Sequence, residues 1–520
     1  MVNTWLSLSV AASLLALSLL RTLLSRSSSA KNLPPGPKPS NFVTGNTIPT
    51  THPWRTFSKW TQQYGDIFTL RIGSTYLFVL GQASSAHAIM EKQSACSSDR
   101  PRQIMAGELI SDNRRMLILP YGTRWRLFRK VLHETLQDKA ARLYEGVQRR
   151  EACIAMLHLG RTPERFQQVF KRYAASVIMQ VTYDYRIDSL EDPLIRQVEE
   201  CLTKLALWIR PGASVLDRYP ALLWLPAVVN PWKQKGLELR EKEQMLFVSQ
   251  WDSVRRRVAQ NQCQPCFVSK VQEKQAELGI TDAEGASLAG SMFGAGSDTT
   301  ASGLAIFVLA MCAFPHVLKA LQAEIDQVCS DNLPRFEDLS AQTTPYLYAT
   351  VQETLRWRPI SAGGFSHKLT QDVEYRGYLL PKGSTVVAPH WSISLDEHEY
   401  PEPHVFRPER FLSPNDGSVK GTWFAPARGS VAFGFGRRVC PGLHIAMRSL
   451  TINLACIAWC FDITSGDPDK VDTLAFTSAA NSHPLPFDAN FVYRSKAREQ
   501  VVMAENRETG ELDRIAAAAR

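Results

Sequence analysis

Residues 2–20 of the chain lack charged side chains, and no acidic residue appears before Asp66. A secretory signal peptide usually has a basic segment before a shorter apolar stretch, so the missing charge at the start argues against one. An uncharged stretch of this length is sufficient to cross a bilayer as a helix. Because Arg21 and Arg26 follow it, the positive-inside rule places the rest of the chain in the cytosol. We expect a transmembrane anchor at residues 2–24; a signal peptide cleaved in the serine-rich segment is the alternative.

The ten cysteines lack a regular spacing along the 520 residues. In a chain this long, irregular spacing argues against a disulfide framework of the kind found in small secreted domains. A reducing compartment is therefore expected, with most thiols acting as small buried hydrophobic groups. Cys263 and Cys266 form an isolated C-x-x-C pair. Without a second pair or histidines at ligand spacing we interpret them as surface thiols, with a zinc site as the alternative.

Motifs for nucleic-acid binding and internal repeats are also missing. The formal net charge is +9, but no zinc-finger, RNA-recognition or basic-zipper pattern is present and the arginines are dispersed, so no nucleic-acid partner is expected. The charge instead fits contact with an anionic cytosolic leaflet and with an acidic protein partner. No Gly/Ser-rich linker interrupts the chain, and 44% hydrophobic with 21% charged residues is a globular composition. These features favour one large domain.

Most of the chain has helical periodicity, and two short regions have strand patterns. Residues 66–81 alternate and turn at Gly73, which predicts a hairpin, and residues 373–387 predict a strand pair broken at Pro381 to Gly383. Helices are predicted at 125–136, 193–209, 238–260, 283–312, 317–329, 346–357 and 443–459. We therefore predict a mainly α fold with a minor β-sheet. The predicted parts are the anchor at 2–24, a proline-rich spacer at 25–40, the main domain at 41–495 and a charged, solvated helical tail at 496–520.

One internal segment, residues 219–232, is strongly apolar yet contains three prolines. Proline removes a backbone donor and disfavours helix, so a regular buried helix is not expected here. The segment is either a buried connector or, given the predicted anchor, a hairpin that dips into the bilayer.

A loop rich in glycine and arginine surrounds Cys440, with the sequence FGFGRRVCPG at residues 433–442. A cysteine in such a loop is structural, a nucleophile, half of a disulfide or a metal ligand. A nucleophile needs a positioned base, and the histidine nearest in sequence, His444, is four residues away. The glycines allow the backbone to approach a bulky, flat group. Arg437 and Arg438 suit carboxylates held beside the sulfur. A thiolate next to two carboxylates, with a helix following, fits haem.

This loop resembles the haem-binding signature of the cytochrome P-450 superfamily, in which five positions are fixed. The matching residues are Phe433, Gly436, Arg438, Cys440 and Gly442. The resemblance implies that Cys440 is the iron ligand and that the other four residues belong to the cofactor-binding loop. It also implies the cytochrome P-450 fold, with a single large haem domain behind the N-terminal membrane anchor.

A second match is GAGSDTT, residues 294–300. Taken alone it is a patch of small residues for close helix packing, with local hydrogen bonds from its polar side chains. However, a carboxylate and hydroxyls in the middle of a buried helix are costly unless they are used. The segment resembles the oxygen-binding helix of the family. The resemblance implies that Ala295 and Gly296 leave room for dioxygen, that the Thr299 hydroxyl holds the bound oxygen, and that Asp298 helps to bring protons from solvent.

A third match combines ETLRWRP with FRPERF, fifty-odd residues later. Glu353 and Arg356 are three residues apart and share one helix face, which alone is typical of a surface salt bridge. With Arg410 they resemble the Glu-Arg-Arg triad of the family, which implies a role in folding and haem seating.

Weaker similarities extend the resemblance over residues 33–495. Trp125 and Arg129, four residues apart, resemble the segment that contacts a haem propionate. His367 is placed like the family's basic propionate-binding residue, although a lone histidine is otherwise often a bystander. SSDRP at residues 97–101 and HPLPF at 483–487 also match in place.

The resemblance implies a haem-thiolate monooxygenase that uses haem b, O2 and NADPH. The electrons come from an NADPH–cytochrome reductase on the same membrane, and a cytochrome b-type donor is a second partner to consider. The implied substrate is a hydrophobic small molecule, with an intermediate of fungal secondary metabolism as the expectation, and the implied location is the endoplasmic reticulum membrane, single-pass, with a cytosolic catalytic domain. The alternatives are a reductase-independent isomerase or peroxygenase, against which Asp298 and Thr299 argue, and a non-enzymatic haem sensor, against which the missing output domain argues.

Overall fold

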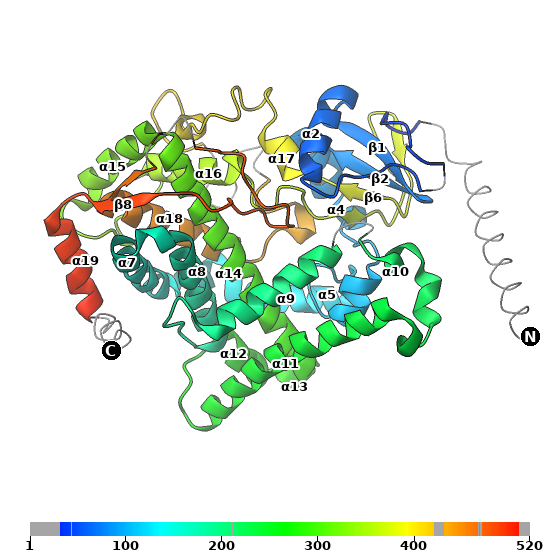
Figure 1. Ribbon diagram of the computed structural model, residues 1–520, viewed down its shortest axis with the longest axis horizontal. Coiled ribbons are helices and arrows are strands. Elements are labelled where there is room, and N and C mark those ends of the chain that lie inside the picture. Colours follow the sequence, from blue (N-terminus) through cyan, green and yellow to red (C-terminus); the bar gives the residue numbers. More distant parts are fainter. Residues whose placement is uncertain are drawn as a thin grey trace, which may run out of the picture. The chain divides into compact units, whose positions relative to one another are not determined.

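The computed structural model describes residues 32–42, 44–209, 213–420, 431–465, 467 and 471–508 (Figure 1). The anchor predicted at 2–24 lies outside the described residues, as do the start of the predicted spacer and the end of the predicted tail. The chain forms two compact units. Unit 1 comprises Met1–Pro101, Gly363–Ile393 and Phe435–Arg438, and unit 2 comprises Arg102–Ala362, Ser394–Gly434 and Val439–Arg520. The predicted domain limits stay predictions.

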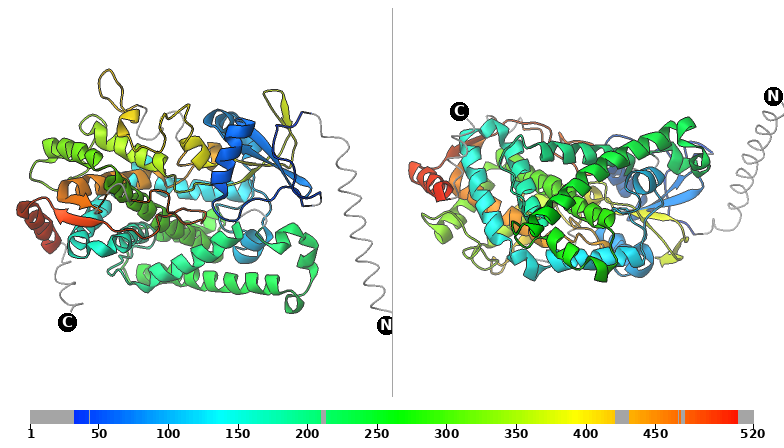
Figure 2. Two further views of the ribbon diagram at one scale, coloured as in Figure 1. Left: turned by 45° about the horizontal axis from the view of Figure 1, so that its top comes forward. Right: turned by 90° about the horizontal axis from the view of Figure 1, so that it is seen from below.

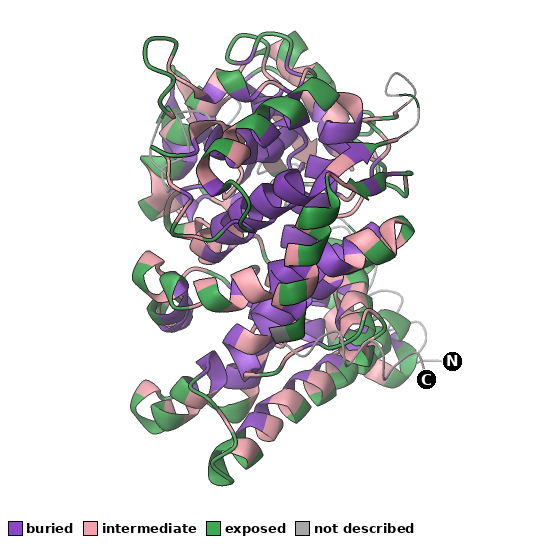
Figure 3. Cartoon of the chain, turned by 90° about the vertical axis from the view of Figure 1, so that its left-hand side faces the viewer, coloured by how far each residue is buried: buried purple, intermediate pink, exposed green. Residues whose placement is uncertain are grey.

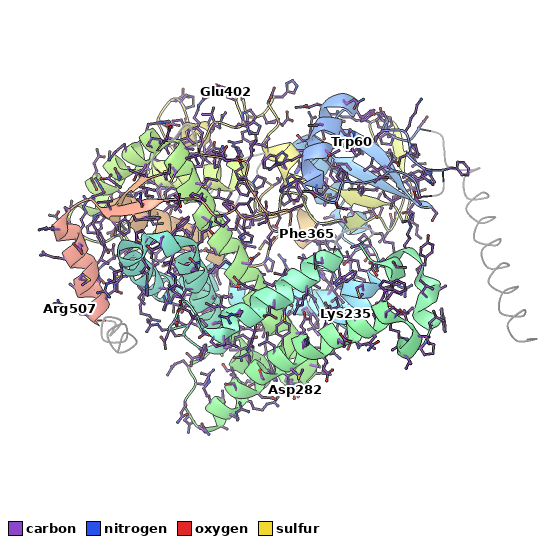
Figure 4. The ribbon with its side chains drawn as sticks, in the orientation of Figure 1. Trp60, Lys235, Asp282, Phe365, Glu402 and Arg507 are labelled. Carbon is purple, nitrogen blue, oxygen red and sulfur yellow. The ribbon has the colours of Figure 1, made fainter. Side chains whose placement is uncertain are left out.

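Unit 1 is built on a four-stranded sheet of order β1-β2-β6-β3. β1 (Ile67–Ile72) and β2 (Thr75–Leu80) form the predicted hairpin, which turns at Gly73, where φ is +60°. β6 (Thr385–Val387) pairs parallel with β2, and β3 (His367–Lys368) pairs antiparallel with β6. Helix α2 (Pro53–Tyr64) covers the sheet with Phe57 packed edge-on against Phe68 of β1. Trp60, labelled in Figure 4, also contacts Phe68 from this helix.

The second predicted strand pair turns at a different place. β4 (Val373–Tyr375) pairs with β5 (Tyr378–Leu380) across Arg376 and Gly377, both of which have positive φ. Two adjacent residues with positive φ are the mark of a tight hairpin turn that matches strand twist. The break predicted at Pro381 to Gly383 is therefore not the turn of this hairpin, because the chain beyond it enters the main sheet as β6. The remaining helical segments assigned to unit 1 residues are α3 (Ala83–Ala86), η1 (His87–Glu91), α4 (Ser94–Ser97) and η7 (Gly436–Arg438), and α17 spans His390–Ser394.

Unit 2 is almost entirely helical. Its elements are η2 (Ile104–Ile110), α5 (Thr123–Leu136), α6 (Asp138–Arg142), α7 (Glu145–Arg161), η3 (Pro163–Arg165), α8 (Phe166–Tyr183), α9 (Pro193–Ile209), α10 (Val215–Arg218), η4 (Pro220–Trp224), η5 (Ala227–Val229), α11 (Pro231–Ala259), α12 (Phe267–Glu273), α13 (Gln275–Leu278), α14 (Asp282–Ala313), α15 (Pro315–Cys329), α16 (Pro345–Trp357), η6 (Pro408–Phe411), α18 (Leu443–Cys460), α19 (Lys496–Glu508), and the strand pair β7 (Phe461–Thr464) with β8 (Asn490–Tyr493). This content confirms the predicted mainly α fold with a minor sheet.

The helix α14 runs through the core of unit 2 beside α8 (Figures 1 and 2). It begins with a capping box in which Thr281 and Glu284 each accept a hydrogen bond from the other's backbone N–H; this satisfies donors that a helix start leaves open. Asp282, labelled in Figure 4, stands in the first turn. α14 and α18 are long and apolar enough to cross a membrane, but 72% and 83% of their most apolar windows are buried inside the protein. In Figure 3 the helices in the centre of the molecule are largely purple, the colour of buried residues. We therefore assign α14 and α18 to the core.

The apolar segment at 219–232 is exposed. It falls in the connection between α9 and α11, helices that run back along each other (Figure 2). The exposed fractions of Trp224 and Val228 are 90% and 92%. The alternative of a buried connector is therefore wrong. Asn230 closes the segment by capping α11, because its Oδ1 accepts the Lys233 N–H at 3.0 Å.

The predicted charged tail is a packed helix as far as Glu508. Val502 and Asn506 of α19 lie one turn apart on the same face, and both are fully buried. α19 packs on α7, where Arg149 forms a two-bond ion pair with Glu505. The expectation of a solvated tail was wrong for this part because two buried positions one helical turn apart are enough to dock an otherwise polar helix.

Candidate functional site

Cys440 lies in unit 2 in the loop that leads into α18. The loop is closed by a hydrogen bond from the Cys440 N–H to the carbonyl of Phe433 at 2.8 Å. Burial raises the pKa of the Cys440 thiol, while the backbone N–H groups of Gly442 and Leu443 and the charge of Arg129 act in the opposite direction. These donors alone leave the pKa above its usual value, so a thiolate here needs a further cation bonded to it. A metal ion bonded to the sulfur would supply this charge, because a coordinating thiol is deprotonated.

Gly442 lies beside the sulfur, and Phe433 is bonded to the backbone of Cys440. Gly442 has φ −87°, which any residue adopts, and a Cβ added to it would lie 3.9 Å from the Cys440 sulfur. The backbone therefore does not require glycine here; the glycine keeps the space beside the sulfur open. Phe433 is half-buried against the core of unit 2. The open space beside the sulfur fits a flat group such as haem.

Helix α5 places Arg129 against the same loop. Its Nη1 donates to the carbonyl of Val439 at 2.5 Å. Burial lowers the pKa of Arg129, and a charge on Cys440 raises it, so an ionised sulfur and this guanidinium stabilise each other. Trp125 lies one turn earlier on α5, is buried, and packs against Tyr121 with ring centroids 5.0 Å apart. The structure thus brings Arg129 to the Cys440 loop, while the predicted propionate contact of Trp125 stays a prediction.

One turn in the middle of α14 is more exposed than the residues on either side of it. Residues 295–299 are all exposed or half-buried, whereas 288–290 and 300–312 are buried. Side chains in the centre of a core helix remain accessible only if a hollow lies beside them, and concave sites of this kind are where ligands bind. Ala295 is the most accessible of them, and Thr299 Oγ1 donates to its carbonyl at 2.8 Å. The predicted oxygen-binding turn is therefore the accessible turn in the middle of this helix.

Gly296 has a different explanation from the one that its motif implies. A Cβ at this position would approach Ile178 of α8 to 2.8 Å. Real Cβ atoms do not approach so closely, so glycine is needed here for the packing of α14 on α8. Room for dioxygen at Gly296 stays a prediction, while the packing role follows directly from the contact.

Asp298 is held by two residues from a distant part of unit 2. Its Oδ1 lies 2.9 Å from Nε2 of His483, and its Oδ2 accepts a hydrogen bond from Asn481 at 2.8 Å. Burial would raise the pKa of Asp298, but the bond and charge of His483 and the bond from Asn481 outweigh it and lower the pKa. The motif around Asp298 gave no signal for these partners, which are 185 and 183 residues further along the chain. HPLPF marked the place of His483 but not its role.

The predicted Glu-Arg-Arg triad is assembled in unit 2. Glu353 is fully buried and forms two bonds with Arg356, of 2.6 and 2.7 Å. Nε of Arg410 lies 3.6 Å from the same carboxylate, and the Arg407 N–H donates to it at 2.8 Å. Arg356 also donates to the carbonyls of Ser394 and Pro403. The cluster ties α16 to the loop before η6, and its role in folding and haem seating stays a prediction.

Unit 1 holds a second group of predicted cofactor residues. Nδ1 of His367 donates to the carbonyl of Ser97 at 2.7 Å, and Nε of Arg438 donates to the carbonyl of Ser98 at 2.8 Å. Burial and the charge of Arg438 lower the pKa of Arg100 to about 9. Burial, followed by the charge of Arg100, lowers the pKa of His367 well below its usual value. Burial is the larger cause in both cases, and the added effect of neighbouring positive charge fits a group with carboxylates.

Two further details of unit 1 concern the predicted cofactor residues. His367 donates its Nδ1–H to a carbonyl, and its lowered pKa favours the neutral ring; its role as a basic propionate-binding residue stays a prediction. Arg100, within the SSDRP string, belongs to the cationic group and was not among the predicted site residues. Gly436 has φ +52°, and a Cβ there would meet the Met90 carbonyl at 2.5 Å. Its N–H donates to Glu91 at 2.6 Å, so only glycine fits this turn.

A separate cavity of about 380 Å³ lies in unit 2 along α9 and α11. Its lining residues are Ile110, Gln197, Glu200, Cys201, Lys204, Leu205, Leu239, Lys242, Glu243, Met245, Leu246 and Ser249. None of them belongs to α14 or to the Cys440 loop, so we do not assign this cavity to the reaction.

The C-x-x-C pair differs from its interpretation as surface thiols. Cys266 is buried and caps α12, while Cys263 is half-exposed. Within the residues that the structure describes, no group of three or more His, Cys, Asp or Glu side chains is placed to hold a metal ion.

Comparison with known proteins agrees with this geometry. The sequence model of the family Cytochrome P-450 matches residues 34–490. The chain is 39% identical to cytochrome P-450 monooxygenase 64 of Postia placenta over 508 residues, which cover 96% of this chain and 99% of that protein. Cytochrome P-450 monooxygenase 88 of the same fungus is 39% identical over 505 residues, with 96% and 99% covered. Cytochrome P-450 monooxygenase fsoB of Humicola fuscoatra is 33% identical over 503 residues, with 95% and 93% covered.

The cysteine loop, the interrupted burial of α14 and similarity over nearly the whole length point the same way. Members of the cytochrome P-450 family work with a haem iron. The chain belongs to this family and is a monooxygenase of the fungal type.

Proposed function

We propose that this chain binds haem b through Cys440 and inserts one oxygen atom of O2 into a hydrophobic small molecule. The observation that carries the proposal is the environment of the Cys440 sulfur, which faces two backbone N–H groups and lies beside Arg129 in front of an open space. When bound, haem supplies the activation of dioxygen at a thiolate-ligated iron.

The residues of unit 2 have distinct tasks in this proposal. Cys440 is the iron ligand, and the N–H groups of Gly442 and Leu443 stabilise its negative charge. Arg129 fixes the loop through the Val439 carbonyl. On α14, the Thr299 hydroxyl and the Asp298 carboxylate lie in the turn that lines the hollow, where they hold and move protons. Roles in haem binding for Trp125, Ala295 and Phe433, and for His367, Gly436 and Arg438 of unit 1, rest on the resemblance.

Electrons reach the cofactor from NADPH through an NADPH–cytochrome reductase, with a cytochrome b-type protein as a further donor. Arg437 is exposed in the loop three residues before the ligand. Exposed cationic residues near the cofactor favour an acidic redox partner, and such contacts mainly set the association rate and specificity.

Membrane attachment is proposed from two features. Within the anchor at residues 2–24, residues 2–20 are uncharged, a stretch long enough to span a bilayer. The connection between α9 and α11 carries exposed Trp224, Val228 and Val229, and apolar side chains of this kind, tryptophan above all, settle at the membrane interface. We therefore place the chain in the endoplasmic reticulum membrane as a single-pass protein with a cytosolic catalytic part. A hydrophobic substrate then reaches the site from the lipid, and the resemblance favours an intermediate of fungal secondary metabolism.

The first experiment is the carbon-monoxide difference spectrum of reduced microsomes that contain the full chain. The wild type is expected to show the red-shifted band of thiolate ligation, and Cys440→Ala is expected to lose it. Cys201→Ala is the matched control, since Cys201 is likewise a half-buried cysteine of unit 2, and it should keep the band. A histidine-like spectrum, or a band that survives Cys440→Ala, would show that the proposed ligand is wrong. NADPH-driven turnover with reductase then separates a monooxygenase from a peroxide-driven enzyme.

A further inference from the structure

The partners of Asp298 form a chain of polar contacts that leads away from α14. His483 and Asn481 each take one carboxylate oxygen of Asp298, at 2.9 and 2.8 Å. Oδ1 of Asn481 in turn accepts a hydrogen bond from the Ser361 hydroxyl at 3.1 Å. This contact fixes which end of the amide faces Asp298, so the carboxylate is held by an oriented donor on one side and by a titratable ring on the other.

The segment that carries these partners is firmly braced. The backbone N–H of Thr477 donates to the carbonyl of His483 at 2.8 Å, and the His483 N–H returns to the Thr477 hydroxyl at 3.0 Å. The Ser482 N–H donates to the carbonyl of Ile360 at 2.6 Å, and the Ser302 hydroxyl of α14 donates to the Ser482 carbonyl at 2.8 Å. The turn is therefore fixed both internally and to α14, and the imidazole is presented to Asp298 without further rearrangement.

Both members of the ion pair keep contact with open space. The side chains of His483 and Asp298 are 24% and 25% exposed, so the ring is able to exchange protons with water while it bonds to the carboxylate. The charge of Lys171 on α8 also lowers the pKa of Asp298, and Lys171 is itself paired with Glu199 at 2.7 Å. Asp298 is thus kept ionised. A neighbouring donor must therefore supply each proton that Asp298 passes on.

We propose that His483 is the positioning residue that supplies protons to Asp298, with Asn481 holding the carboxylate in the orientation for transfer. The inference rests on the proposed function, in which Asp298 delivers protons. In the transfer the Nε2–H bond of the imidazolium breaks and an O–H bond forms at Oδ1, which leaves a neutral imidazole and a carboxylic acid; no electron moves. Asp298 then releases the proton towards the Thr299 hydroxyl and returns to the carboxylate, and His483 takes up a proton (as hydronium) from bulk solvent.

The test compares His483→Gln, His483→Ala and the control His316→Gln in the full-length holoenzyme with reductase. Glutamine keeps an N–H donor for Asp298 but carries no exchangeable charge. His316 is an exposed histidine on α15 of the same unit. NADPH oxidation is followed between about pH 5 and 8, the range in which imidazoles titrate. Oxidation of tetramethylphenylenediamine driven by cumene hydroperoxide is measured in parallel, because a peroxide brings its own protons and electrons.

We expect His483→Gln to slow NADPH oxidation about tenfold, a modest share of the usual general-acid contribution, and to flatten its pH profile. The peroxide-driven rate should stay within about twofold of wild type, and His316→Gln should match wild type in both assays. An unchanged NADPH rate and pH profile in His483→Gln would overturn the proposal, and so would an equal loss in both assays, which is the signature of a structural role. Should His483→Gln bind no haem, His483→Asn decides by the same criteria.

A second readout is independent of turnover. Thermal unfolding is measured for Asp298→Asn, His483→Gln and the double variant. Each single change should lower Tm by about 1 °C, as expected for a partly exposed ion pair in a chain of this size, and the double variant should fall no further than the larger single shift. Strictly additive shifts would show that the pair does not exist. Because this cycle and the Cys440 spectrum are separate measurements, failure of the proton-supply role is distinguishable from failure of haem ligation.

Discussion

The buried Glu353–Arg356 pair gives the sharpest test of what holds unit 2 together. Substitution of Glu353 by glutamine keeps the side-chain volume and removes one negative charge from a fully buried site. Arg356 then retains its bonds to the Ser394 and Pro403 carbonyls but loses its counter-charge. Arg410, 3.6 Å from the same carboxylate, loses it as well.

The expected cost follows from the burial of both partners. Removing one member of a buried pair leaves an uncompensated charge in a medium of low polarity, which costs about 3–5 kcal/mol. With an average unfolding entropy per residue, a chain of this length has an unfolding entropy of about 1 kcal/mol/K, so Tm should fall by about 3–5 °C. A double variant, Glu353→Leu with Arg356→Met, removes both charges and should recover part of this loss.

The assay is differential scanning calorimetry of the haem-bound chain, together with the ratio of the thiolate to the inactive carbon-monoxide band. A surface pair serves as the control: Lys235→Gln removes the exposed partner of Glu238 on α11, and exposed pairs of this kind are worth about 0.5 kcal/mol or less. A shift below about 1 °C for Glu353→Gln would refute the reasoning, because it would mean that the buried charge is compensated elsewhere. A double variant less stable than the single one would refute it as well.

Three further predictions follow from single contacts and one titration. Gly436→Ala should lower the free energy of unfolding by about 1–3 kcal/mol and reduce haem content per protein, because φ is +52° and a carbonyl lies 2.5 Å from the new Cβ. Gly442→Ala, whose new Cβ has one contact at 3.9 Å, should fold normally. Calorimetry and the haem absorbance check both variants. Gly296→Ala should cost about 1–3 kcal/mol of unfolding free energy through its clash with Ile178, and Ile178→Val should recover part of it in urea titrations. Burial lowers the pKa of His390 to about 4 in the folded chain. As the pH falls, the unfolded chain therefore binds the proton before the folded chain does. The free energy of unfolding is full above about pH 6.5 and falls by about 2–3 kcal/mol by about pH 4.5. His390→Asn should flatten the Tm profile over this range, and an unchanged slope would contradict the assignment.

The sequence predicted the parts of the site that are local in the chain. The Cys440 loop, the GAGSDTT turn and the strongly periodic helices, α5, α9 and α14 to α16 among them, were all found because each carries its signal within a short window. α7 and α8 were not predicted. Both are buried on most of their faces, and a helix without a polar face has no 3.6-residue alternation to detect.

Long-range features were beyond a single sequence for a related reason. Nothing near Asp298 indicates that His483 and Asn481 meet it, since such a pairing depends on how two distant segments fold back. The helix α19 was predicted as solvated because its composition is charged, yet two buried positions, Val502 and Asn506, dock it. The pairing of β6 with β2 was also not predicted, because the sequence of a three-residue strand does not determine which strand it pairs with.

The hollow beside residues 295–299 of α14 has a consequence for how this protein can evolve or be engineered. A core helix that leaves one turn uncovered forgoes the hydrophobic stabilisation that larger side chains there would give, about 25 cal/mol for each Å² removed from water. A change such as Ala295→Leu would therefore raise the melting temperature while it fills the space in which we propose that the reaction takes place. Selection for thermostability alone would favour such substitutions in this turn and yield a more stable but inactive protein. Libraries built for stability should therefore hold residues 295–299 constant.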